Sequence, residues 1–309
     1  MIEKERRVAI VTDAAADLPG LQELRTSFGV GPIKQVPLFV NIGSDRFIVG
    51  ESNQEDCQPI NNEIFKDRIN REIKNKSGLI PKTAAPNETY FDEAYREPIQ
   101  QGLDVVSVHI GKEMSATIAA ATSASKKIEG NRISIFDTQT VSMAQGLMAI
   151  EAEKMAANGA TKEEIVEMLT DMRERTTLRV VTPNFPFLVA SGRVPGATGM
   201  IGRVLSLIPI LGIDHITEDN KVQKKGMVRR EVKSVEWMED YLVKGKTIEQ
   251  LAIVDFEATE ISDKFVRKLL DNKIISKDKI YRGNLGPITG SHSGPGTWGM
   301  AVVRETKKS

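Results

Sequence analysis

Val8-Ala9-Ile10-Val11-Thr12-Asp13, close to the amino terminus, is the stretch that decides the fold. Its short apolar run predicts a strand buried in a parallel sheet. Thr12 and Asp13 then lie at the carboxyl end of that strand, which is the edge where open α/β sheets bind their ligands. We therefore expect the chain to begin with an α/β unit.

Predicted strands and helices alternate from this stretch to about residue 175. We expect strands over residues 36–40, 104–110 and 133–138, and helices over residues 63–74, 143–158 and 161–175. Asp17 is expected to cap a helix that has Pro19 in its first turn, Asn87 to cap another helix, and residues 82–86 to form a short loop. Residues 161–164 have the pattern of a capping box. The alternation favours a doubly wound, mostly parallel sheet over residues 1–175.

The pattern changes after residue 176. Strands are expected over residues 180–182, 208–211 and 251–254, helices over residues 200–207, 232–242 and 261–270, and a hairpin turn at residues 219–220. Fewer helices separate these strands, which favours a mixed sheet. We expect two α/β domains, an N-terminal domain over residues 1–175 and a C-terminal domain over residues 176–309.

Composition narrows the class of protein. The 309 residues suggest about two domains, and the Lys+Arg and Asp+Glu totals are both 42, so no net field attracts nucleic acid. The single cysteine, Cys57, excludes an internal disulfide and fits a reducing cytoplasm. His109, His215 and His292 are scattered, without the spacing of zinc ligands. The start of the chain has no signal-peptide pattern, and the apolar residues 200–213 are too short a run to span a bilayer. A soluble cytoplasmic protein without a metal is expected.

A glycine-rich stretch near the carboxyl end, residues 289–299 with the sequence TGSHSGPGTWG, is the most unusual segment. Its glycines permit positive φ and close approach of the backbone, and Pro295 stiffens the turn. A histidine held in this way, His292, suits an anionic or polar ligand. The alternative is a tight turn between strands that carries a solvated histidine.

Ser115 is the second candidate. It lies where an alanine-rich helix is expected to begin, so its hydroxyl either caps that helix or faces an anion together with the first free N–H groups. A Ser115–His292–Asp13 triad can be drawn, but nothing in the sequence brings the three side chains together. The chain has no G-x-G-x-x-G after its first strand and no G-x-S-x-G, so we expect no dinucleotide cofactor and no α/β-hydrolase nucleophile.

The order of motifs resembles the DegV family of bacterial fatty-acid-binding proteins, which present an acyl chain to a fatty acid kinase. The motifs are VAIVTDAAADLP, KTAAPN, the loop over residues 114–117, IFDTQT, ASGRV, PILGI, MVRR and GSHSGPG, and they cover nearly the whole chain. The resemblance implies two α/β domains with the acyl chain in a tunnel between them. It implies a bound long-chain fatty acid and no other cofactor. The partners it implies are a fatty acid kinase catalytic subunit and transient contact with a membrane during ligand exchange.

The resemblance also implies the roles of particular residues. The carboxylate of the fatty acid would be bound by Thr83, Ser115, Thr117 and His292. Near the tunnel mouth, facing the kinase, it places Arg193, Arg229 and Ser293. Without the resemblance, the basic residues around Arg229 are either a solvated face or a docking surface. Residues 200–213 are either a tunnel wall or ordinary core.

Departures from the family pattern leave other functions open. Alanines replace small polar residues or glycine at Ala14, Ala84 and Ala116, and Ala85 adds a further alanine to the second of these motifs. A divergent lipid carrier with no kinase partner is one alternative. A stand-alone hydrolase or transferase acting on a lipid-like carboxylate or ester is the other.

Overall fold

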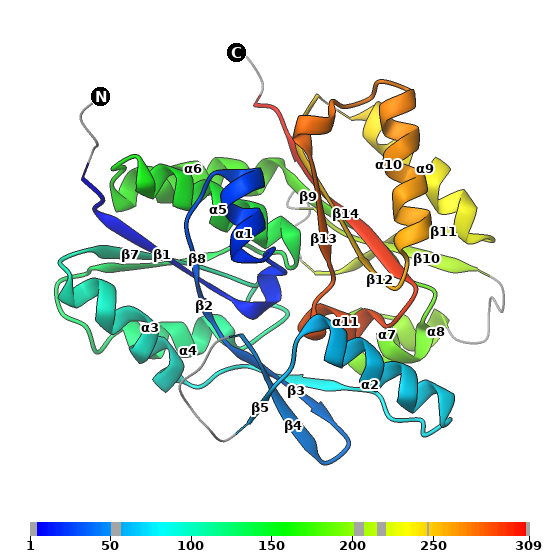
Figure 1. Ribbon diagram of the computed structural model, residues 1–309, viewed down its shortest axis with the longest axis horizontal. Helices are drawn as coiled ribbons and strands as arrows, with labels where there is room; N and C mark the ends of the chain where they lie inside the picture. The colour runs from blue at the N-terminus through cyan, green and yellow to red at the C-terminus, as the bar shows by residue number, and fades with distance from the viewer. Residues whose placement is uncertain (1–4, 51–56, 201–206, 215–220, 246, 307–309) are drawn as a thin grey trace.

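The computed structural model describes residues 5–50, 57–200, 207–214, 221–245 and 247–306. Three sheets organise these residues, two from the first half of the chain and one from the second (Figure 1). None of the helices in the described ranges is long and apolar enough to cross a membrane. The helix predicted over residues 200–207 and the hairpin turn at residues 219–220 lie almost wholly outside the described ranges.

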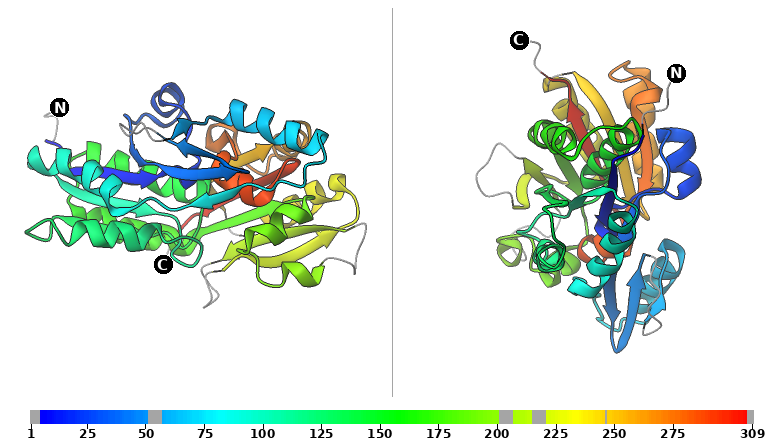
Figure 2. Two further views of the ribbon diagram at one scale, coloured as in Figure 1. Left: turned by 90° about the horizontal axis from the view of Figure 1, so that it is seen from below. Right: turned by 90° about the vertical axis from the view of Figure 1, so that its left-hand side faces the viewer.

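The first sheet is parallel and contains the stretch that opens the chain. Its order is β2-β1-β7-β8, formed by Lys34–Val36, Val8–Asp13, Asp104–His109 and Ile133–Asp137. Two helices cover each face, as Figures 1 and 2 show. These are α3 and α4 on one face and α5 and α6 on the other, at Glu88–Gln100, Thr117–Ser125, Met143–Ala157 and Lys162–Arg175. The doubly wound prediction is confirmed, as are the cap by Asn87 and the capping box of Thr161 and Glu164.

A second, smaller sheet was not predicted. Its order is β5-β4-β3-β6, from Gln58–Pro59, Asp45–Val49, Leu38–Ile42 and Lys82–Ala84. The single strand expected over residues 36–40 is wrong because Pro37, which has no N–H for a ladder, separates β2 of the first sheet from β3 of the second. The loop expected over residues 82–86 is also wrong in part, since Lys82–Ala84 pairs with β3 as strand β6. Helix α2, Asn62–Lys74, connects β5 to β6 along the chain and lies beside this sheet.

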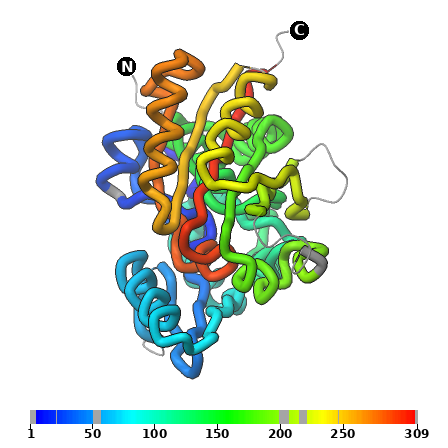
Figure 3. Tube along the Cα trace, turned by 90° about the vertical axis from the view of Figure 1, so that its right-hand side faces the viewer, coloured from blue at the N-terminus to red at the C-terminus, as the bar shows by residue number. Residues whose placement is uncertain are grey.

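The third sheet comes from the second half of the chain. Its order is β11-β10-β9-β14-β12-β13, from Gln223–Val228, Ile208–Asp214, Thr176–Val181, Thr297–Arg304, Ile248–Phe256 and Ile280–Asn284. All neighbours are antiparallel except β12 and β13, so the predicted mixed sheet is confirmed. Helices α9 and α10, Glu231–Lys244 and Thr259–Asp271, cover its outer face (Figure 3). Because α6 ends at Arg175 and β9 begins at Thr176, we propose residues 1–175 and 176–309 as the two domains.

The short elements connect these layers. They are η1, Ala14–Ala16; α1, Leu21–Glu23; η2, Leu24–Phe28; α7, Phe185–Ser191; α8, Ala197–Met200; η3, Lys277–Lys279; and α11, Pro287–Ser293. Helix α11 lies where a glycine-rich turn was expected, and that expectation is wrong for its first part. Pro287 occupies the first helical position and Gly294, with φ of 75°, ends the helix. This is the arrangement that proline and glycine favour at the two ends of a helix.

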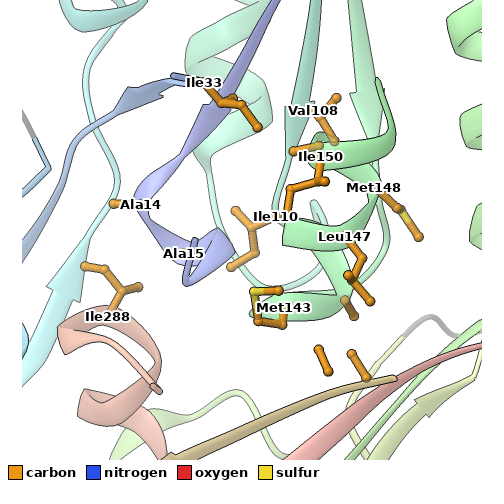
Figure 4. Close-up of a cluster of buried hydrophobic side chains, with 14 of the residues drawn as sticks. Ala14, Ala15, Ile33, Val108, Ile110, Met143, Leu147, Met148, Ile150 and Ile288 are labelled. Carbon is orange, nitrogen blue, oxygen red and sulfur yellow. The ribbon is translucent and has the colours of Figure 1, made fainter. Parts of the chain in front are cut away.

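The two halves share one hydrophobic core. Helix α5 contributes Leu147, Met148 and Ile150, all fully buried, and the inner face of the third sheet contributes Val254 and Ala301. Figure 4 shows Ile110, which directly follows β7, Met143 of α5 and Ile288 of α11 around the same interior. Burial of these side chains stabilises the fold by about 1.5–3 kcal/mol for each large aliphatic residue. The halves are therefore held together by apolar packing on either side of α5.

Candidate functional site

A cavity of about 240 Å³ lies between the two halves, where the family resemblance implied a tunnel. The second half of the chain contributes β9, β10, α7 and α11 to its wall, and the first half contributes β6 and the segments after β6, β7 and β8. Most of the lining is aliphatic, including Leu38, Ile110, Val141, Leu178, Val180, Leu188, Leu211 and Ile213. Such a lining favours a hydrocarbon ligand over a polar one.

A group of polar side chains interrupts this aliphatic lining. Thr83, Ser115, Arg193, His292 and Ser293 all lie on the cavity wall, so five of the seven predicted site residues share one cavity. Thr83 lies in strand β6, where it pairs with Val40 of β3, and this pairing fixes its position on the cavity wall. A hydrogen bond of 2.8 Å joins Thr83 Oγ1 to His292 Nε2. The first and second halves of the chain therefore meet at a polar contact on the cavity wall.

His292 is neutral near pH 7. Burial, with a smaller contribution from the positive charge of Arg193, lowers the pKa of His292 from 6.5 to about 4. Its Nδ1 atom is covered and has no hydrogen-bond partner among the residues that the structure describes. The alternative of a solvated histidine in a surface turn is therefore wrong.

Ser115 and Thr117 form a second polar contact. Their hydroxyls are 2.7 Å apart, and Ser115 Oγ also accepts the backbone N–H of Thr117 at 3.3 Å. Ser115 lies two residues before α4 and lines the cavity, whereas Thr117 is fully buried and does not line it. Thr117 can therefore orient Ser115 but does not itself face the cavity.

The three residues expected near the cavity mouth have different surroundings. Arg193 is exposed, and it donates from Nη1 to the Ser191 carbonyl at 2.7 Å and from Nε to the Met114 carbonyl at 3.4 Å. Ser293 donates to the Thr289 carbonyl at 3.0 Å. Arg229 is exposed beyond the end of β11 and is not part of the cavity lining. The structure thus brings Arg193 and Ser293 to the cavity, but not Arg229.

The triad considered from the sequence is not assembled. Asp13 Oδ2 bonds to His109 Nδ1 at 2.9 Å, and His109 Nε2 bonds in turn to Ser107 Oγ at 2.5 Å. All three side chains are completely buried in the first sheet, with the Tyr95 hydroxyl 2.8 Å beyond Ser107. Asp13 therefore belongs to a structural network, while His292 is bonded to Thr83.

Asp17 has a role that the sequence analysis missed. It does not cap α1, because its own backbone ends η1 with φ of 50°. Its buried carboxylate instead accepts hydrogen bonds from Ser142 Oγ at 2.6 Å, the Gly286 N–H at 2.9 Å and Thr289 Oγ1 at 2.9 Å. Burial raises the pKa of Asp17 from 3.8 to about 7, although these hydrogen bonds oppose the rise.

Comparison with known proteins agrees with this architecture. Residues 7–305 match the family described as "Uncharacterised protein, DegV family". The chain belongs to the DegV family. A DegV domain-containing protein from Caldanaerobacter subterraneus subsp. tengcongensis is 26% identical over 298 residues, which are 95% of this chain and 98% of that protein.

Solved DegV structures share the fold. A fatty-acid-binding DegV protein from Thermus thermophilus aligns with a TM-score of 0.80 and 25% identity, over 97% of this chain and 100% of the other. A Thermotoga maritima protein with fatty acid binding function aligns with a TM-score of 0.78 and 23% identity, over 97% and 100% of the two chains. DegV proteins of known structure thus include fatty-acid-binding proteins with this arrangement of two α/β units.

Proposed function

We propose that this DegV protein binds a long-chain fatty acid in the cavity between its halves and presents the carboxylate to a fatty acid kinase. The observation that carries the proposal is the cavity itself, an aliphatic chamber whose wall includes Thr83, Ser115 and His292. The fatty acid binding of the related Thermus thermophilus protein supports the class of ligand.

The aliphatic wall accounts for most of the proposed affinity. Each methylene group that leaves water for an apolar surface contributes about 0.8 kcal/mol. The wall offers branched side chains from both halves, such as Ile110, Leu178 and Ile213. A long acyl chain gains more from this surface than from any single polar contact.

The hydroxyls of Thr83 and Ser115 orient the head group. Since His292 is neutral near pH 7, one of its two ring nitrogens carries a proton. If Nε2 carries it, His292 donates to Thr83 Oγ1 and leaves the Thr83 hydroxyl proton free for a carboxylate. Hydrogen bonds to a charged group contribute about 1.5–3 kcal/mol each. Arg193, whose guanidinium donates to the Ser191 and Met114 carbonyls, is left for the kinase step and not counted among the carboxylate ligands.

Presentation to a kinase is the second part of the proposal. Phosphoryl transfer is accelerated by fixed positive charge around the transferred group, with little covalent chemistry required of the carrier. Arg193 lines the cavity, and Arg229, the residue directly after β11, is exposed. The protein would therefore be a carrier, with the catalytic nucleotide site on its partner.

Titration with matched ligands tests the binding function. A labelled fatty acid should bind, and the alcohol of the same chain length should bind more weakly because it lacks the charge. A fatty acyl ester incubated with the protein alone should stay intact. Equal affinity for acid and alcohol would contradict a carboxylate site, and ester cleavage would favour the hydrolase alternative.

A further inference from the structure

The Asp17 carboxylate joins the two halves beside the cavity. Ser142, in the segment before α5, donates to one oxygen, and Gly286 and Thr289, at the start of α11, donate to the carboxylate from the other half. The three partners are 125, 269 and 272 residues away along the chain. Asp17 therefore holds the beginning of α11, and the bond from His292 to Thr83 holds its end.

The position of Asp17 is tightly constrained. Its backbone adopts the left-handed region, with φ of 50°, and a β-carbon on Gly286 would lie 2.9 Å from its Oδ1 atom. The left-handed conformation is uncommon for residues other than glycine, and aspartate is among those that adopt it most readily. The carboxylate is thus held against the start of α11 by its hydrogen bonds and by its close contact with Gly286.

Asp17 also determines which hydroxyls the cavity offers. Ser142 and Thr289 both line the cavity, yet both direct their hydroxyl protons to Asp17. On its other side Asp17 borders a separate polar cavity of about 430 Å³. The lining hydroxyls of Thr182, Ser191 and Ser293 donate to backbone carbonyls. With the Ser142 and Thr289 protons engaged by Asp17, Thr83 and Ser115 remain as the hydroxyls placed to meet a head group.

We propose that Asp17 is a positioning residue for the carboxylate site. It fixes α11, and with it His292 and Thr83, and it withholds the Ser142 and Thr289 hydroxyls from the ligand. This inference rests on the proposed fatty acid binding. It predicts that loss of Asp17 changes the preference for a carboxylate head group, beyond any change in stability.

The test compares Asp17→Ala with Gln250→Ala. Gln250 of β12 donates to Glu151 of α5 at 2.7 Å, so it also links the halves, but neither residue lines the cavity. The affinities for a labelled fatty acid and for the alcohol of the same chain length are measured for each protein. Asp17→Ala should reduce fatty acid affinity about tenfold, the loss expected for impaired hydrogen bonding to a charged group, and alcohol affinity less than about twofold. Gln250→Ala should keep the wild-type ratio of fatty acid affinity to alcohol affinity.

A ligand-free measurement separates this inference from the proposed function. The ¹⁵N resonances of the His292 ring report its protonation and its bond to Thr83, and the chain has only three histidines to assign. Asp17→Ala, or Asp17→Asn if the alanine variant does not fold, should shift them, while Gln250→Ala should not. Unchanged His292 resonances, or an unchanged acid-to-alcohol ratio in a folded Asp17 variant, would overturn the inference. If the wild-type protein bound the fatty acid and the alcohol with equal affinity, that result would instead contradict the proposed function.

Discussion

Thr83 and His292 are 209 residues apart in the chain, and their side chains meet at 2.8 Å on the wall of the cavity. Thr83 comes from the edge of the small second sheet, and His292 from the last turn of α11. The contact therefore reports the relative placement of the two halves at the point where a carboxylate would be bound.

Removal of the two proposed hydroxyl donors should weaken ligand binding without unfolding the protein. The Thr83→Ala, Ser115→Ala double variant is expected to lose about 1.5–3 kcal/mol of fatty acid binding free energy for each hydrogen bond to the charged group. Thr182→Val is the matched control, since Thr182 also lines the cavity but its hydroxyl donates to the Ser293 carbonyl. Binding is measured by titration with a labelled fatty acid. Unaltered binding in the double variant would show that Thr83 and Ser115 do not bind the carboxylate.

His292 should make the folded protein less stable in acid. Its folded pKa of about 4 lies below the ordinary value of 6.5, so the unfolded chain binds the proton more readily. The associated stability is present above pH 6.5 and is lost as the pH falls from 6.5 towards 4. Relative to His292→Gln, the wild-type protein should lose roughly 1–3 kcal/mol across that range.

Denaturant unfolding at several pH values measures this difference. The comparison needs the variant because Asp17, with its pKa raised to about 7, has the opposite effect and favours the folded state at low pH. Its contribution is present below pH 3.8 and is lost as the pH rises through 7. A stability difference between wild type and His292→Gln that does not vary with pH would show that His292 titrates normally.

Gly290 should resist replacement by alanine even though it lies in a helix. In an exposed helix this change stabilises by about 1 kcal/mol. Here the added β-carbon would lie 2.9 Å from Phe65 Cε1 and 3.3 Å from Phe256 Cδ1, both rings being buried. Overpacking of this kind costs about 1–3 kcal/mol, so the melting temperature should fall. Gly20→Ala, with no atom within 4 Å of the new β-carbon, is the control. A stabilised Gly290→Ala variant would refute the close packing of α11.

Arg193 and Arg229 should matter more for the kinase reaction than for ligand affinity. The Arg193→Ala, Arg229→Ala variant is expected to keep most of its fatty acid affinity and to lower acyl-phosphate formation with a cognate kinase and ATP, because fixed charge near the phosphoryl group is removed. Lys233→Ala, which removes an exposed cation paired with Glu236, serves as a charge control. Equal acyl-phosphate output from wild type and the double variant would exclude the role. No output from the wild-type protein would favour a carrier without a kinase partner.

Local sequence patterns predicted the main sheets, because each buried strand carries its own apolar run. They did not predict β6, since three residues such as Lys82–Ala84 become a strand only by pairing with β3. Local patterns also could not predict the hydrogen bonds of Asp17, because its partners are 125 or more residues away along the chain. Helix α11 could have been predicted from Pro287 and Gly294, but Gly290 between them and Gly296 beyond them favoured a turn. Of the seven predicted site residues, the five that line the cavity are carried by the family motifs, and the role of these residues in binding stays a prediction.

The most direct test of the central claim is mass spectrometry of lipid extracted from the purified protein. The account predicts a long-chain fatty acid, near one molecule per chain, and its loss from a variant in which Val180→Trp fills the aliphatic wall. Glu163→Ala, a change at an exposed residue that does not line the cavity, should retain the lipid. Recovery of no lipid from the wild-type protein, even after incubation with fatty acid, or equal recovery from the Val180→Trp variant, would contradict a fatty acid site between the two halves.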